Sequence, residues 1–110
     1  MGEKHFNRLT PTEAELLALL SEECGELVQA IGKILRHGLH SHHPVTHVGN
    51  ATALAKEMGD VFAAMKMVTD HLIVHPRSVE ENCEKKLANV RRYLHHEIIL
   101  SPTTESGRAA

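Results

Sequence analysis

The sequence predicts an all-α fold: a helical bundle of three long helices, with a short C-terminal helix as an open addition, completed by oligomerisation. Apolar residues recur at steps of three and four along three long segments. Signals for starting and stopping helices stand at the ends of these segments. Aromatic residues make up only 3% of the 110 residues, and Trp is absent, which argues against a β-sandwich or barrel.

The first helix is predicted over residues 11–37. Thr10 can cap it, Pro11 suits the first helical position, and Glu13 stands where a capping box requires an acid. Gly38 suits the left-handed position that ends a helix. One predicted apolar stripe runs along this helix: Leu16, Leu20, Cys24, Leu27, Ile31 and Ile34.

Residues 38–49 have the composition of a loop, and Asn50 or Thr52 can begin the second helix. His75 and Pro76 are expected to stop it. The predicted stripe consists of Leu54, Met58, Val61, Phe62, Met65, Val68 and Leu72.

The third helix is expected to open with a capping box at Ser78 and Glu81. Its stripe is Cys83, Leu87, Val90 and Leu94. Residues 95–100 are compatible with a short fourth helix or with an apolar docking segment. Residues 1–9 are expected to be a polar leader and residues 101–110 a disordered tail, so that the chain is a single domain over residues 1–110.

Three helices of this length do not easily close a core alone, because each stripe must face another helix. A second copy of the chain can supply the missing helices. We therefore expect a homodimer or a homotetramer.

Composition excludes several classes of protein. The formal net charge of −2 and the scarcity of aromatic residues disfavour a nucleic acid polymer as partner. No apolar run approaches the length of a membrane span or fits a signal peptide. Two Cys residues form no disulfide framework, which favours a cytoplasmic location.

Two pairs of acids lie at the edges of the apolar stripes. Glu23 and Glu26 are spaced i, i+3 in the first helix, and Glu57 and Asp60 repeat that spacing in the second. If the helices pack by their stripes, four carboxylates converge and repel one another, and a hard cation such as Mg²⁺ relieves the repulsion. The alternative is that each pair is an ordinary solvated acidic face.

The two acidic segments, 22–26 (EECGE) and 57–60 (EMGD), resemble the EExxE…ExxD signature of the MazG-like nucleoside triphosphate pyrophosphohydrolases, members of the all-α NTP pyrophosphatase superfamily. The resemblance spans residues 10 to about 95. It implies a Mg²⁺ site in which Mn²⁺ can substitute, an oligomeric assembly, and hydrolysis of a nucleoside triphosphate, a dNTP for example, to the monophosphate and pyrophosphate.

The resemblance also implies roles for individual residues. It gives the metal ligands as Glu23, Glu26, Glu57 and Asp60. Glu22 is expected to orient or deprotonate the attacking water, although it could instead replace Glu23 as a ligand.

Basic residues are expected to hold the phosphates. Lys33 lies on the polar band of the first helix that carries Glu22 and Glu26. In the third helix Lys85, Asn89 and Arg92 line one side, in an arrangement similar to a basic C-terminal element of dimeric relatives. An ordinary solvated face is the alternative for this second group.

The sequence leaves open the role of the loop histidines and the choice between several functions. The loop histidines could bind a transition metal, or the loop could close over the base of the substrate; they are His37, His40, His42, His43 and His47. A phosphoribosyl-ATP pyrophosphohydrolase, an enzyme acting on alarmones, and a non-catalytic helical oligomerisation module are the alternative functions.

Overall fold

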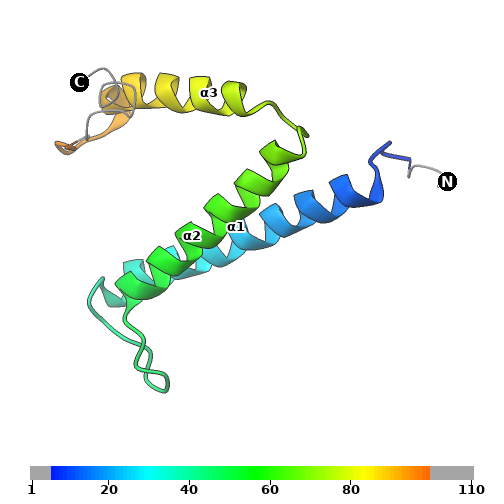
Figure 1. Cartoon of the computed structure of the whole chain (residues 1–110). Helices are drawn as coiled ribbons and strands as arrows, with labels where there is room; N and C mark the ends of the chain where they lie inside the picture. The colour runs from blue at the N-terminus through cyan, green and yellow to red at the C-terminus, as the bar shows by residue number, and fades with distance from the viewer. Residues whose placement is uncertain (1–5, 100–110) are drawn as a thin grey trace, which may run out of the picture. The chain divides into compact units, whose positions relative to one another are not determined.

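A computed structural model describes residues 6–99 of the chain (Figure 1). Its elements, in chain order, are α1 (Pro11–His37), α2 (Asn50–Asp70), α3 (Pro76–Asn89) and a short 3₁₀ helix, Val90–Tyr93. The part of the chain described contains no strand beyond an isolated bridge between His42 and Gly49. The all-α prediction is confirmed. The expected tail, and residues 1–5 of the expected leader, lie outside the described residues.

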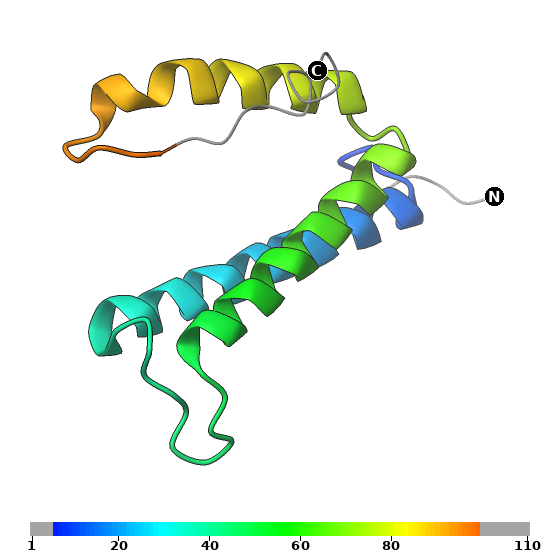
Figure 2. The same ribbon diagram turned by 60° about the vertical axis from the view of Figure 1, so that its left-hand side comes forward.

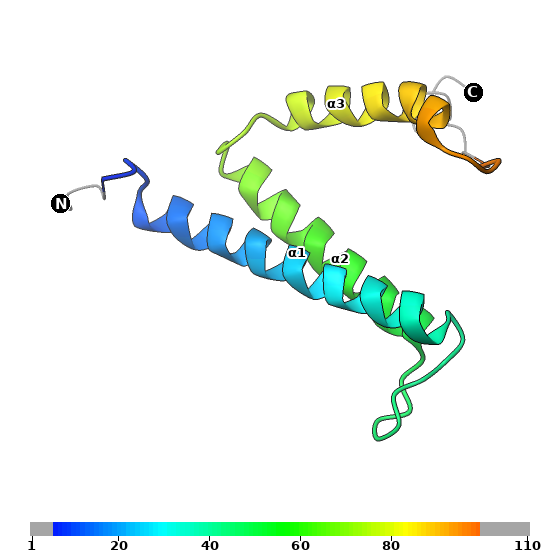
Figure 3. The same ribbon diagram turned by 180° about the vertical axis from the view of Figure 1, so that it is seen from behind.

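The chain divides into two compact units, Met1–Pro76 and Arg77–Ala110. In the first unit α1 and α2 pack against each other, and the chain reverses direction between them through the loop at residues 38–49 (Figures 1 and 3). The two helices therefore form an antiparallel hairpin. Among residues 6–99, no helix is both long enough and apolar enough to cross a membrane.

Both ends of α1 follow the local sequence signals. The N–H of Glu13 donates to Oγ1 of Thr10 over 3.1 Å, and the N–H of Thr10 donates to Oε1 of Glu13 over 2.8 Å. This reciprocal pair is the expected capping box. At the other end Gly38 has a φ of 93° and its N–H donates to the carbonyl of Ile34 over 2.7 Å. A side chain at this φ would be strained, which explains the glycine.

The packed face of α1 differs from the predicted stripe. Leu16 and Ala30 are its buried residues, whereas Cys24 is exposed and Ile31 is 42% exposed. Residues three and four positions apart share a face of a helix, so the same apolar residues are compatible with more than one packed face. The face of α1 that packs includes Glu23, which is half-buried. The prediction was therefore wrong at positions 24 and 31, and an acid lies where an apolar residue was expected.

The packed face of α2 is likewise built from small side chains. Its buried residues are Val61, Ala64 and Val68. Three larger residues of the predicted stripe stay exposed: Met58 (45%), Phe62 (68%) and Met65 (37%). Small residues let the helix backbones approach closely, so the bulky apolar residues are left on a second, outward face.

The end of α2 and the start of α3 were placed wrongly by the sequence. Helix α2 ends at Asp70, and Leu72 has a left-handed φ of 56°, which ends the helical path before Pro76. Pro76 instead begins α3, because its fixed φ suits a first helical position. Ser78 therefore lies inside α3, where its carbonyl accepts a bond of 2.7 Å from Nδ2 of Asn82. The capping box expected at Ser78 does not form.

Helix α3 also ends sooner than its apolar pattern suggested. Asn89 is its last residue, Val90 belongs to the 3₁₀ helix, and Leu94 follows that helix. The short helix after α3 thus occupies 90–93, and residues 94–99 form no helix in the described chain.

Candidate active site

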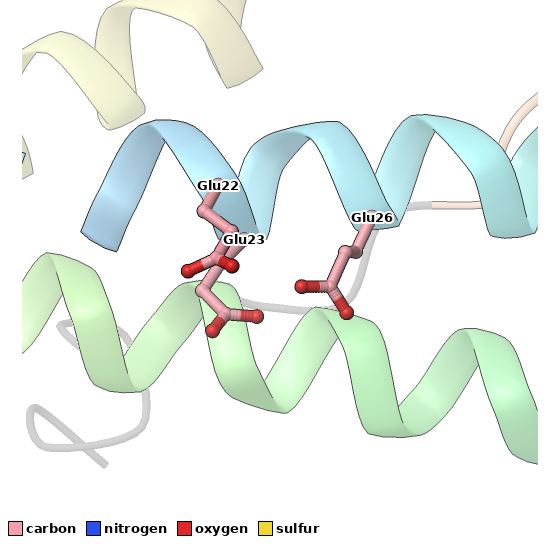
Figure 4. A group of neighbouring side chains, drawn as sticks. All are labelled: Glu22, Glu23 and Glu26. Atoms are coloured by element: carbon pink, nitrogen blue, oxygen red, sulfur yellow. The ribbon is translucent and has the colours of Figure 1, made fainter. Parts of the chain in front are cut away.

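Five carboxylates gather along the seam between α1 and α2. One triad, Glu22, Glu23 and Glu26, lies on α1; the second joins Glu23 to Glu57 and Asp60 of α2. Within each triad the three oxygen atoms lie no more than 4.8 Å apart. Figure 4 shows the side chains of the α1 triad extending from one side of the helix, the side on which α2 is drawn. We call these five residues the acidic cluster.

Glu23 connects the two triads because it lies on the packed face of α1. It is half-buried, as are Glu57 and Asp60 opposite it. Partial burial is the main cause that raises the pKa of Glu23, and the charges of Glu26 and Asp60 raise it further. The ionised form of the cluster therefore destabilises the folded, metal-free protein.

One oxygen atom of the cluster has no partner. Oε1 of Glu57 is buried and forms no hydrogen bond, while the Glu57 side chain as a whole is 17% exposed. A buried acceptor without a donor is unfavourable. The carboxylate of Glu57 also offers an oxygen atom within 4.8 Å of oxygen atoms of Glu23 and Asp60, and carboxylates are the ligands that Mg²⁺ prefers. The residues present thus fit a divalent cation.

Lys56 is part of the site, although the sequence analysis did not identify it. Its Nζ lies 2.7 Å from Oδ2 of Asp60 and 3.9 Å from Oε2 of Glu57. The hydrogen bond to Asp60 and the charges of both acids raise the pKa of Lys56. The i, i+4 spacing from Lys56 to Asp60 is the signal that could have found it. The ammonium offsets part of the negative charge of the cluster.

The expected phosphate-binding residues are divided between the two units. Lys33 is on α1 but lines a separate pocket of about 600 Å³ beside the loop. Lys85 and Asn89 are on α3, where Nδ2 of Asn89 donates to the carbonyl of Lys85 over 2.8 Å. The sequence predicted Arg92 on the same side of the third helix as these two residues. Arg92 instead belongs to the 3₁₀ helix, so it does not continue their α-helical spacing. Lys85, Asn89 and Arg92 all belong to the second unit.

The loop at residues 38–49 is ordered by its own hydrogen bonds. The N–H of His43 donates to the carbonyl of Val48 over 2.9 Å, and the N–H of Asn50 donates to that of Ser41 over 2.8 Å. Side-chain groups that could hold a metal ion occur, among the described residues, only in the acidic cluster. The loop histidines form no such group there, which removes the geometric support for a transition metal in the loop.

Comparison with known proteins gives one match. The family model of the MazG nucleotide pyrophosphohydrolase domain matches residues 11–92, a range that includes the whole acidic cluster. No curated protein and no solved structure gives a significant match.

Proposed function

The chain belongs to the MazG nucleotide pyrophosphohydrolase domain family, and on this premise we propose that it is a Mg²⁺-dependent enzyme that hydrolyses nucleoside triphosphates, dNTPs among them, to the monophosphate and pyrophosphate. The family match supports nucleotide pyrophosphohydrolase activity in general. The observation that carries the metal dependence is the buried, unpartnered Oε1 of Glu57 within a group of three carboxylates.

The acidic cluster is proposed to hold the metal. Glu23, Glu57 and Asp60 supply oxygen atoms from both helices, and Glu26 adds a fourth carboxylate beside Glu23. A bound divalent ion polarises the phosphate, offsets its negative charge and makes a bound water more acidic. The proposed ligands are drawn from two helices that pack together, so the hairpin itself sets their positions.

Glu22 is proposed to handle the attacking water. It is an exposed member of its triad, next to the half-buried Glu23, and an exposed carboxylate can accept a proton from water. Its conversion to Gln should lower kcat with little change in KM, because the contacts of the ground state survive. If this variant instead weakens metal binding as much as Glu26→Gln does, Glu22 is a ligand.

Cationic and amide groups are proposed to bind the phosphates. In the second unit these are Lys85, Asn89 and Arg92. In the first unit Lys33 is proposed to bind a phosphate group from the pocket that it lines. Losing one such contact reduces substrate binding and the stabilisation of developing charge together. Lys85→Ala should therefore raise KM for the triphosphate.

A homodimer or homotetramer is proposed to cover the outward face of α2. Met58, Phe62 and Met65 are spaced i, i+4 and i+7 and are all exposed, so they form one apolar stripe. On α1, Val28 and Leu35 are also exposed, by 67% and 81%. Light scattering at micromolar concentration should show at least a dimer, and a monomer would contradict the proposal.

The decisive experiment measures pyrophosphate release from a panel of nucleotides, with Mg²⁺ and with a chelator. We expect turnover only with the metal and its loss in Asp60→Asn. Helix α2 offers a matched control, Asp70→Asn, because Lys66 pairs with Asp70 over 3.0 Å in the same i, i+4 geometry as Lys56 with Asp60. The control should retain activity.

Two results would contradict the proposal. If no nucleotide is hydrolysed while the protein is folded, a non-catalytic oligomerisation module is the better description. Equal activity in Asp60→Asn and the wild-type protein would exclude the acidic cluster as the site.

A further inference from the structure

A pocket lies where the end of α1, the loop and the start of α2 meet. Its volume is about 600 Å³, which is within the range of small-molecule sites. Lys33 and Arg36 line it from α1, His42 and His43 from the loop, and Asn50 from α2. We call it the loop pocket. All of these residues belong to the first unit. Figure 2 shows the loop joining these two helix ends.

The lining of the loop pocket is cationic. Lys33 and Arg36 are basic, and the pocket is also lined by three histidines, His37, His42 and His43. None of the residues that line it is acidic, and none is Phe, Tyr or Trp. Arg presents a planar set of N–H donors that matches a phosphate. The two basic side chains suit an anionic group, and Pro44, Val48 and Ala53 add apolar surface beside them.

Hydrogen bonding at Nδ1 fixes the tautomer of the neutral His43 ring. Its Nδ1 accepts from the N–H of Val45 over 3.0 Å and from the N–H of Thr46 over 3.2 Å. In a neutral imidazole whose Nδ1 is an acceptor, Nε2 carries the proton. The remaining ring nitrogen therefore donates a hydrogen bond, which an anion accepts and a metal ion cannot use.

The start of α2 adds to the positive field. Gly49 caps this helix without any side-chain hydrogen bond, and its first turn contains no acidic residue. The partial positive charge of the helix N-terminus is thus not offset by a carboxylate there. At the facing end of α1 the last turn carries Arg36 and His37, which complement the opposite partial charge.

The pocket is preformed. The loop is closed by the bond from His43 to Val48 and by the bridge between His42 and Gly49. Nδ2 of Asn50 donates to the carbonyl of Gly38 over 3.0 Å, which ties the start of α2 to the end of α1. A ligand therefore does not have to order the loop, which lowers the entropic cost of binding.

The loop pocket and the acidic cluster lie along the same seam. Lys33 follows Glu26 by about two turns, or roughly 10 Å along α1, and on nearly the same face. Ala53, which also lines the pocket, precedes Glu57 by about one turn, or roughly 6 Å along α2. A single nucleotide whose phosphates lie at the cluster can therefore reach the pocket with its other end.

From these observations we propose that the loop pocket is a phosphate-binding subsite, separate from the acidic cluster, in which Lys33, Arg36 and Nε2 of His43 hold a phosphate group. Either of two molecules can carry this phosphate group. One is a second phosphate carried on the sugar or base side of a nucleotide substrate, and that assignment rests on the proposed function. The other is free pyrophosphate, the product that such an enzyme releases.

The binding test uses the full chain in the presence of a chelator, so that it does not depend on activity. Titration calorimetry with inorganic pyrophosphate should show binding that weakens as salt is added. Arg36→Gln should reduce the affinity about tenfold or more, because a charge-assisted contact is lost, and Lys33→Gln should have a similar effect. Lys66→Gln removes the same charge from α2 within the first unit, roughly 20 Å along the helix from Ala53, and should leave the affinity unchanged. Circular dichroism checks that each variant is folded.

A kinetic comparison identifies the source of the phosphate. If a substrate carries it, a nucleoside 5′-triphosphate with an added 3′-phosphate should have a KM about tenfold lower than the plain triphosphate, and Arg36→Gln should abolish this difference. If the product carries it, the 3′-phosphate should have no effect, and Arg36→Gln should relieve inhibition by added pyrophosphate.

The subsite would be refuted if pyrophosphate does not bind, or if it binds Arg36→Gln and Lys33→Gln as tightly as the wild-type protein. Binding of Zn²⁺ at these histidines with no binding of pyrophosphate would also overturn it. Loss of turnover with intact binding of pyrophosphate would instead refute the proposed function and leave the subsite standing.

Discussion

Changing Glu57 to Gln should separate the electrostatic cost of the acidic cluster from its function. The ligand oxygens of Glu57, Glu23 and Asp60 lie within 4.8 Å of one another, so the ionised carboxylate of Glu57 is repelled by two neighbouring carboxylates. The variant removes two such repulsions. It also removes the attraction to Lys56 at 3.9 Å, which offsets about one of the two repulsions.

The net relief is about one repulsion between charges that are screened by water, so the Tm in chelator should rise by only a few degrees. Thermal unfolding in a chelator, at one fixed protein concentration, measures it. Adding Mg²⁺ should then raise the Tm of the wild-type protein, because an ion that binds only the folded state stabilises it. The variant should gain much less from the metal and should not turn over substrate.

Glu15→Gln is the matched control for this experiment, because Glu15 is an exposed acid of α1 outside the cluster. It should change neither the Tm in chelator nor the response to Mg²⁺. A lower Tm of Glu57→Gln in chelator would show that the carboxylate is a structural partner of Lys56, and the reasoning about repulsion would be wrong.

Three further predictions concern stability and metal binding. The pKa of Glu23 is raised above its ordinary value of 4.5, so the folded metal-free protein binds this proton more tightly than the unfolded chain. The free energy of unfolding should therefore rise as the pH falls through the raised pKa toward 4.5. Glu23→Gln should remove this pH dependence, which denaturant titrations at several pH values measure. Lys56→Gln should strengthen Mg²⁺ binding several-fold in calorimetry, because no ammonium then has to leave Asp60, and equal or weaker binding would count against this competition. Thr10→Ala should lower stability by about 1 kcal/mol through loss of the cap, whereas the exposed Thr12→Ala should stay within about 0.5 kcal/mol of the wild-type protein.

Features that depend on neighbouring residues were predictable from the sequence. The capping box at Thr10, the end of α1 at Gly38 and the loop at residues 38–49 all follow from local chemistry, and the structure confirms them. The choice between apolar residues was not local. Ala30 and Ala64 are buried while Ile31 and Phe62 are exposed, because the closest approach of two helices decides which face packs.

In the site, too, local spacing was predictable from the sequence and the packing of the helices was not. The i, i+3 spacing indicated both acid pairs, since it places them on one side of a helix. It did not indicate that Glu23 would be shared by two triads, because this depends on the packed face. The loop pocket was missed because Arg36, His43 and Asn50 come together only through the hydrogen bonds of the loop.

The antiparallel hairpin has a consequence for the order in which the protein folds during synthesis. Every residue of the acidic cluster belongs to α1 or α2, so the cluster can form once residue 70 has left the ribosome. Contacts between helices joined by a short loop are local in sequence, and such contacts form quickly. The carboxylates can therefore meet before α3 has emerged from the ribosome, and their mutual repulsion acts on the hairpin while it forms.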